Sequence, residues 1–210
     1  HPSLSPNPNP NPDPNPTALS AAAAAAAADV IAAGVEASST LSVAAIGSNA
    51  DVAQLFNAAT FGPQILWLFM ILLPNAGVTK KIMGPLPSVI AFCLVHFAIV
   101  VISASQEAGT APIAEFAGVF DPAGEPLKAM QGMMSYPNFV SEEWSHVLTW
   151  DLFVGRYIWL DGLRRGIFTP HSVLLCNLIG PPGLLLHCAT SLLSGKGLPG
   201  VDELEEESEA

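Results

Sequence analysis

The sequence predicts an all-α integral membrane protein with about four transmembrane helices. Half of its 210 residues are apolar and only 12% are charged, whereas about a quarter of the residues in soluble domains are charged. A helix of about 20 apolar residues crosses the roughly 30 Å of bilayer hydrocarbon. Segments of this kind occupy residues 52–74, 86–105, 143–163 and 170–193. We therefore place a four-helix membrane domain at residues 51–194.

Residues 1–50 are expected to form an extended tether followed by a surface helix. Every second residue is proline in the NPNPNPDPNP run, which favours a polyproline II conformation. Eight consecutive alanines within residues 18–33 favour a helix, but alanine gives little drive for membrane insertion. The chain starts with His1, and we expect that any targeting peptide has already been removed.

The first two spans are strongly apolar. Pro63 is expected to kink the first span. The polar residues of this span either meet the charges of the third span or form ordinary interhelical hydrogen bonds: Gln54, Asn57 and Gln64. The second span carries His96 near its middle.

Two acidic segments lie outside the spans. Residues 106–142 are too polar and too rich in glycine and proline to cross a membrane, although the apolar piece LKAMQGMM is suited to the membrane surface. Residues 195–210 form an acidic tail, and the net charge of the whole chain is −11. Such a charge argues against nucleic acid as a partner.

The third and fourth spans carry charges and helix breakers. A charged side chain near the bilayer centre costs about 2.5–3.5 kcal/mol on insertion scales, so Asp151 and Arg156 should face the protein interior. Asp161 precedes Arg165 by four residues, which is a favourable ion-pair spacing in a helix. The fourth span should be broken or kinked at its helix-breaking residues: Gly180, Pro181 and Pro182.

Several histidines and aromatic residues are candidates for binding a pigment. A neutral imidazole of His96, His171 or His187 is a possible ligand for the magnesium of a chlorophyll, although such histidines commonly hydrogen-bond a neighbour instead. Helical spacing places a second group of side chains on one stripe: His146, Trp150, Phe153 and Tyr157. These side chains, with Trp159, either form a wall for a flat or polyene ligand or anchor the span at the membrane interface.

The sequence contains none of the common motifs for a bound metal, a phosphate or a nucleophilic serine. The three cysteines form no CxxC pair, and we expect them to be small buried side chains. No redox cofactor is indicated. An acid–base mechanism through Asp151 or a histidine stays open.

Residues 144–190 resemble the neoxanthin-synthase-like, abscisic-acid-deficient family of plants and algae. The resemblance rests on WxHxLxxDLFVGRxIxLDxxRRGI followed by HSVxLCxxxGPxGLLxH. It is close over the third and fourth spans, loose over the first two, and covers neither residues 1–50 nor the acidic tail. It implies a small chloroplast membrane protein that converts violaxanthin to neoxanthin by opening an epoxide to an allene, without a redox cofactor.

The resemblance also implies which residues would take part in catalysis or binding. If the protein is an enzyme, Asp151 or His146 would move a proton and Arg156 would stabilise a developing oxyanion. The other positions that the family pattern carries over are Asp161, His171, Gly180 and Pro181. Pro182 departs from that pattern.

The terminal segments cannot fold by burying apolar surface on their own, which favours a larger assembly that holds them. We therefore interpret the chain as a non-catalytic, pigment-associated subunit of a photosystem with its light-harvesting antenna. Its pigment would be a carotenoid, with chlorophyll as a further option, and its other contacts would be membrane lipid. The alternative is a xanthophyll isomerase.

Charge in the loops predicts the orientation of the four spans. Lys80 and Lys81 follow the first span, and Arg164 and Arg165 follow the third. Four spans place both pairs on one side, which the positive-inside rule assigns to the stroma of a thylakoid. The N-terminus, the long acidic loop and the acidic tail are then expected in the lumen.

Overall fold

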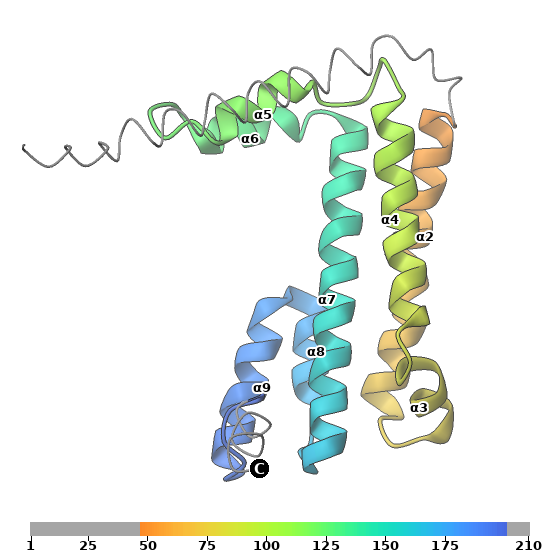
Figure 1. Ribbon diagram of the computed structural model, residues 1–210, viewed down its shortest axis with the longest axis vertical. Helices are drawn as coiled ribbons and strands as arrows, with labels where there is room; N and C mark the ends of the chain where they lie inside the picture. Colours follow the sequence, from red (N-terminus) through yellow and green to blue (C-terminus); the bar gives the residue numbers. More distant parts are fainter. Residues whose placement is uncertain (1–46, 201–210) are drawn as a thin grey trace, which may run out of the picture. The chain divides into compact units, whose positions relative to one another are not determined.

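The computed structural model describes residues 47–200, and its regular secondary structure over that range is entirely helical (Figure 1). The all-α class is therefore confirmed for these residues. The proline-rich segment, the surface helix expected at 18–33 and residues 201–210 lie outside the described range. The helices are α2 (Asn49–Leu72), α3 (Gly77–Met83), α4 (Pro87–Ala104), α5 (Ile113–Val119), α6 (Pro126–Met133), α7 (Pro137–Arg165), α8 (Pro170–Ile179) and α9 (Pro181–Leu193).

The long helices α2, α4 and α7 pack against one another and form the centre of the fold. Helix α2 begins with a capping box, in which the Ser48 hydroxyl accepts from the backbone N–H of Asp51 and the Asp51 carboxylate accepts from that of Ser48. This pairing satisfies backbone donors that a helix start leaves free. Helix α2 continues through the buried Pro63 without a break.

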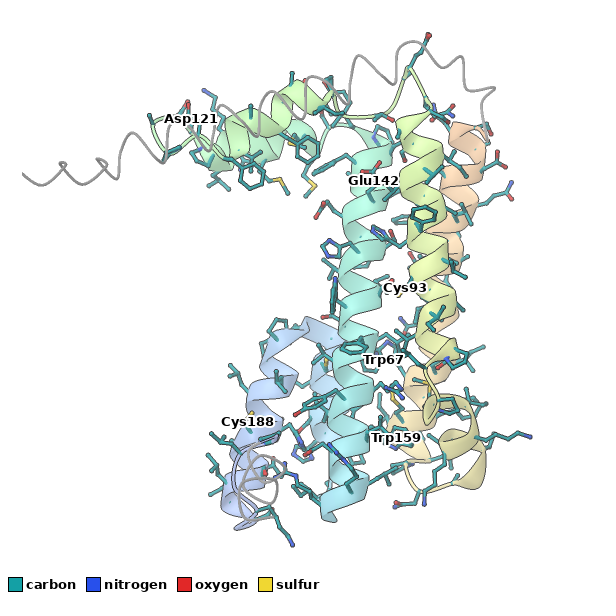
Figure 2. The ribbon with its side chains drawn as sticks, viewed as in Figure 1. Trp67, Cys93, Asp121, Glu142, Trp159 and Cys188 are labelled. Carbon is teal, nitrogen blue, oxygen red and sulfur yellow. The ribbon has the colours of Figure 1, made fainter. Side chains whose placement is uncertain are left out.

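A tryptophan holds α2 against α7. The indole of Trp67 is buried in the larger apolar cluster, and it lies over Gly155 of α7, where an added Cβ would overlap its ring. On the next turn of α7, the buried Trp159 donates its indole N–H to the carbonyl of Pro74 at 2.9 Å. Figure 2 shows both indoles near the α3 end of α7.

Two helices are long and apolar enough to cross a membrane, α2 and α4. Only 22% of the residues in the most apolar stretch of each are buried within the protein. Large apolar side chains are correspondingly exposed, including Phe61 at 68% and Leu94 at 62%. Water-soluble monomers rarely expose apolar surface so continuously, so these faces are suited to lipid.

Residues 170–193 do not form the single kinked span that the sequence predicted. They form two short helices, α8 and α9, which pack side by side as a hairpin (Figure 1). The 10 residues of α8 are about 15 Å long, half the thickness of the hydrocarbon. The expected fourth crossing is therefore wrong.

The turn of this hairpin has a clear local cause. Gly180 adopts φ 67° and ψ −115°, a backbone conformation that side chains other than hydrogen disfavour. Pro181 and Pro182 follow it at the start of α9, where missing N–H groups cost little. Gly183 then faces the backbone of Cys176, and an added Cβ would overlap it. Glycine thus permits both the reversal and the close approach.

The hairpin returns the chain to the end of α7 from which it left. The Arg165 guanidinium donates to the carbonyl of Lys196 at 2.9 Å, and the Ser191 hydroxyl donates to the carbonyl of Gly197 at 2.6 Å. Residues 195–200, the start of the segment predicted as an acidic tail, therefore lie at the same end as Arg165. The sequence had placed them at the opposite end.

The opposite end of the bundle is closed by asparagines. Asn138 Nδ2 donates to Asn49 Oδ1, and Asn49 Nδ2 donates to the carbonyl of Ala108, both at 2.9 Å. These contacts join the start of α2, the start of α7 and the segment that follows α4.

Helices α5 and α6 pack together in the long connection between α4 and α7. Their small apolar core contains Met133 and the first-turn residue Phe139 of α7. The Tyr136 hydroxyl donates to Glu115 at 2.7 Å, and this bond raises the pKa of Tyr136. The piece LKAMQGMM expected at a membrane surface falls in and just after α6, with Leu127 exposed.

Candidate functional site

A groove of about 490 Å³ runs between α4 and α7. Its walls are mostly apolar, and its titratable groups are two imidazoles and the thiol of Cys93. Figure 2 shows Cys93 on the α4 side. The lining residues are Leu86, Val89, Ile90, Cys93 and His96 from the α4 side and His146, Thr149, Trp150 and Phe153 from α7.

Helical spacing brings the α7 residues of the groove together. His146, Thr149, Trp150 and Phe153 follow one another at intervals of three, one and three residues, which places them on one side of a helix. On α4, Cys93 and His96 are likewise one turn apart. The rings of Trp150 and Phe153 meet edge to face, with centroids 5.8 Å apart. The aromatic stripe expected on α7 thus forms part of a groove.

The two histidines of the groove stack on each other. Their ring centroids lie 5.7 Å apart, with 29° between the planes. His96 Nδ1 lies 2.9 Å from the Ser145 hydroxyl, which donates to the carbonyl of Glu142 at 3.0 Å. Because that hydroxyl has one hydrogen, Nδ1 of His96 is the donor in this arrangement. His96 Nε2 then carries a lone pair, as a base or a magnesium ligand requires.

Two other aromatic candidates lie outside the groove. Trp159 is fully buried in the core, where Pro74 accepts its N–H. Its position fits neither a pigment wall nor an interface anchor. Tyr157 is half-buried and lies towards Gly200. The structure therefore assigns only part of the predicted aromatic set to a common surface.

Asp151 lies beside the turn of the α8–α9 hairpin. An added Cβ on Gly180 would be 2.6 Å from Asp151 Oδ1, so the carboxylate sits directly against this glycine. The backbone carbonyl of Asp151 accepts from the Cys176 thiol at 3.5 Å. Among residues 47–200, no group hydrogen-bonds to the carboxylate itself. Asp151 is half-buried, in agreement with the expected inward position.

Arg156 closes the end of α3 and the turn after it. Its Nε donates to the carbonyl of Met83 at 2.7 Å, and its Nη2 donates to the carbonyl of Gly84. A charged donor that satisfies two carbonyls at a helix C-terminus is a structural contact. The guanidinium is therefore occupied by the backbone, and no acidic partner is needed to explain its position.

The residues suspected of catalysis do not meet in the structure. Asp151 contacts the hairpin, Arg156 contacts α3, and His146 stacks on His96. Asp151 and Arg156 are five residues apart, so their side chains leave α7 about 140° apart. Of the three, only His146 lies in the groove.

A second polar centre lies where α7 meets α9. The ion pair expected between Asp161 and Arg165 is present, with Arg165 Nη2 2.5 Å from Asp161 Oδ2. His187 Nε2 lies 2.7 Å from the same oxygen, and both side chains are at most 1% exposed. This partner was missed because 26 residues separate it from Asp161. His187 is enclosed by protein and presents no ring to a pigment.

His171 is also held by the hairpin. Its Nε2 lies 2.9 Å from the Thr190 hydroxyl, and its ring stacks on Phe168 with 5.5 Å between centroids. Of the three histidines proposed as pigment ligands, His96 is therefore the one that lines the groove. Residues 47–200 contain no cluster of three or more histidine, cysteine or acidic side chains arranged to hold a metal ion.

The described part of the chain is helical, its two most apolar helices, α2 and α4, are long enough to cross a membrane, and an apolar groove lies between α4 and α7. The ABA DEFICIENT 4-like family model matches residues 54–187, and the chain belongs to this family. It is 29% identical to Protein ABA DEFICIENT 4, chloroplastic, from Arabidopsis thaliana over 139 residues. That alignment covers 66% of this chain and 61% of the relative. No solved structure matches the chain.

Proposed function

We propose that this protein is a chloroplast membrane protein that binds a xanthophyll in the groove between α4 and α7. The groove carries the proposal, because its apolar walls suit a polyene and its imidazoles offer hydrogen bonds to a ring oxygen. The chloroplast location is proposed from the relative's name. The pigment class is proposed from the family resemblance of residues 144–190.

The membrane topology that we propose has three crossings. Helices α2 and α4 cross as the most apolar segments, and α7, with 29 residues, is long enough to cross between them. The α8–α9 hairpin enters from one side and returns to it, with its irregular backbone at Gly180 packed against protein rather than lipid. In this topology, three crossings and a half-inserted hairpin replace the four crossings expected from composition.

The same topology orients the protein by the positive-inside rule. One end of the bundle, which we place in the stroma, carries five basic residues: Lys80 and Lys81 in α3, Arg164 and Arg165 in the last turn of α7, and Lys196 after α9. The start of α2 and the acidic connection 105–136 are at the other end, which we place in the thylakoid lumen. The C-terminal segment then leaves the bundle on the stromal side.

We propose a non-catalytic role, as a pigment-associated subunit beside a photosystem core or its antenna. Asp151 and Arg156 are outside the groove, and Arg156 is engaged by the carbonyls of Met83 and Gly84. A bound xanthophyll would therefore meet one of the three residues suspected of catalysis. Chlorophyll is a second pigment that the groove could hold, through Nε2 of His96.

The stacked histidines favour one further candidate, xanthophyll epoxide isomerisation. In that reaction the epoxide C–O bond breaks, its oxygen gains a proton, and a base removes a proton from the polyene as the allene forms. His146 would supply the first proton and Nε2 of His96 would accept the second, so no oxidant or reductant is consumed. The observation that favours this candidate is the pairing of both imidazoles inside one groove.

Cys93 provides a direct test of the groove. It is exposed, whereas Cys176 is buried, so a Cys188→Ser variant leaves Cys93 as the accessible thiol. Violaxanthin bound in the groove should slow maleimide labelling of Cys93 in detergent or liposomes. Phe153→Ala should reduce this protection, while Phe97→Ala, an exposed α4 position outside the groove, should not. Unchanged labelling with saturating pigment would sink the proposal.

Pigment analysis of the same sample separates the two roles. Violaxanthin recovered unchanged supports the subunit role, and allenic product supports isomerisation. Native size separation of gently solubilised thylakoids tests the assembly, because a subunit should migrate with a photosystem–antenna band after a salt wash. Migration as a small free species would contradict the subunit role.

A further inference from the structure

The exposed face of α2 carries a regular stripe of three amide and two large apolar side chains. Its members follow the 3, 4, 3, 4 spacing of coiled-coil seams. All of them are exposed in the described structure: Gln54, Asn57, Phe61, Gln64 and Leu68. The buried side chains of α2, such as Ala59 and Trp67, lie on a different side of the helix.

The amide groups of this stripe are poorly satisfied. Within residues 47–200, no group hydrogen-bonds to the side chains of Gln54 or Asn57. Gln64 reaches only the backbone carbonyl of Thr60, at 3.4 Å. In hydrocarbon, an amide without a partner loses the hydrogen bonds that water would provide. Lipid is therefore an unfavourable neighbour for this face.

We propose that the stripe is the interface with the α2 helix of a second copy of this chain. An amide carries both donors and acceptors, so identical residues facing each other across a two-fold axis can satisfy one another. Two copies in one membrane share the same orientation, and a two-fold axis along the membrane normal pairs α2 helices in parallel. Phe61 and Leu68 then fill the seam between the amide pairs.

The surface beside the stripe also suits a packed partner. A hollow of about 420 Å³ lies next to Asn57, between α2 and the segment that begins α7, with Phe56, Met134 and Val140 in its walls. Side chains of an approaching helix can enter such a hollow, as knobs enter holes in helix packing. The inference rests on the proposed membrane placement of α2 and is independent of the pigment.

Disulfide trapping tests the interface in the full chain. Asn57→Cys would be made in a background in which the three native cysteines are alanine, and the protein would be reconstituted in liposomes and oxidised. The expected product is a cross-linked pair of two copies. Leu94→Cys, at an exposed apolar position of α4, is the matched control and should give little cross-linking.

The contribution of the amide side chains is tested by measuring how strongly two copies of the chain associate. The double variant Gln54→Leu and Asn57→Leu should associate roughly tenfold more weakly, as expected for two lost interhelical hydrogen bonds. Energy transfer between fluorescently labelled copies, measured at increasing lipid-to-protein ratios, gives the ratio of the two association constants. The control variant Asn57→Gln keeps an amide and should retain association. Unchanged association of the leucine variant would overturn the proposal.

Three further outcomes would also overturn it. Equal cross-linking at positions 57 and 94 would indicate random collision. Cross-linking to a different protein in thylakoids, with none between purified copies, would identify another partner. If trapping appears only after removal of residues 1–46, that segment of the chain itself covers the face. Resistance to carbonate extraction and Cys93 protection report membrane insertion and pigment binding separately from these results.

Discussion

Nε2 of His171 lies 2.9 Å from the hydroxyl oxygen of Thr190, although 19 residues separate the two along the chain. In a continuous helix these residues would be about 28 Å apart. The contact therefore requires the chain to reverse between them, and it does so at Gly180. This reversal decides at which end of the helical bundle the C-terminal segment begins.

Labelling with a membrane-impermeant maleimide tests the reversal. Single cysteines at Ser194, Val78 and Phe120 in a cysteine-free background should fall into two classes, with positions 194 and 78 labelled from the same side. The hairpin returns residue 194 to the end of α7 near the α2–α3 connection, whereas residue 120 belongs to the opposite end. Labelling of positions 194 and 120 from the same side of the membrane would instead support four crossings.

Gly183→Ala should destabilise the hairpin. The new methyl group would overlap the backbone of Cys176, and overpacking of this kind costs about 1–3 kcal/mol. Thermal unfolding in detergent should show a lower midpoint. Gly132→Ala is the control, because a Cβ there meets nothing within 4 Å and alanine favours a helix. Equal midpoints for both variants would show that the close approach is absent.

Arg156→Ala should reduce stability more than pigment binding. The substitution leaves the carbonyls of Met83 and Gly84 without their charged donor, and hydrogen bonds to charged groups contribute about 1.5–3 kcal/mol each at most. Unfolding midpoints and Cys93 protection would be measured on the same preparation. A variant of normal stability that no longer converts or holds xanthophyll would instead show a functional role for Arg156.

Asp161→Asn should be strongly destabilising, by about 3–5 kcal/mol, because it removes one side of a buried charged contact. A double-mutant cycle with His187→Gln isolates the direct contact between these two side chains. Coupling of about 0.5–3 kcal/mol is expected for partners in one network. Additive effects of the two substitutions would indicate that they do not interact.

Violaxanthin protection of Cys93 should depend on His146 as well as on Phe153. His146→Ala removes an imidazole that stacks on His96 and lines the groove. His171→Ala serves as its control, because His171 bonds Thr190 on the hairpin instead. Protection lost equally in both variants would point to a general disturbance of the fold rather than to the groove.

The spacing of residues along the sequence was enough to predict several features of the structure. The apolar runs predicted the helical class and both candidate crossings, and the four-residue interval between Asp161 and Arg165 predicted their ion pair. The interval pattern of His146, Trp150 and Phe153 predicted a shared stripe. Each of these depends on helical periodicity alone, which acts over a few residues.

Contacts between distant residues were decided only by the tertiary structure. The sequence marked Gly180 to Pro182 as a break, but a kink and a full reversal use the same residues. Whether α9 continues the direction of α8 or turns back beside it depends on the packing of Gly183 against Cys176. It also depends on the hydrogen bond between His171 and Thr190. Likewise, the partners of Arg156 and His187 lie 72 or 73 and 26 residues away. Helical periodicity relates residues only a few positions apart, so it cannot predict contacts over such separations. These contacts form only when the whole chain folds.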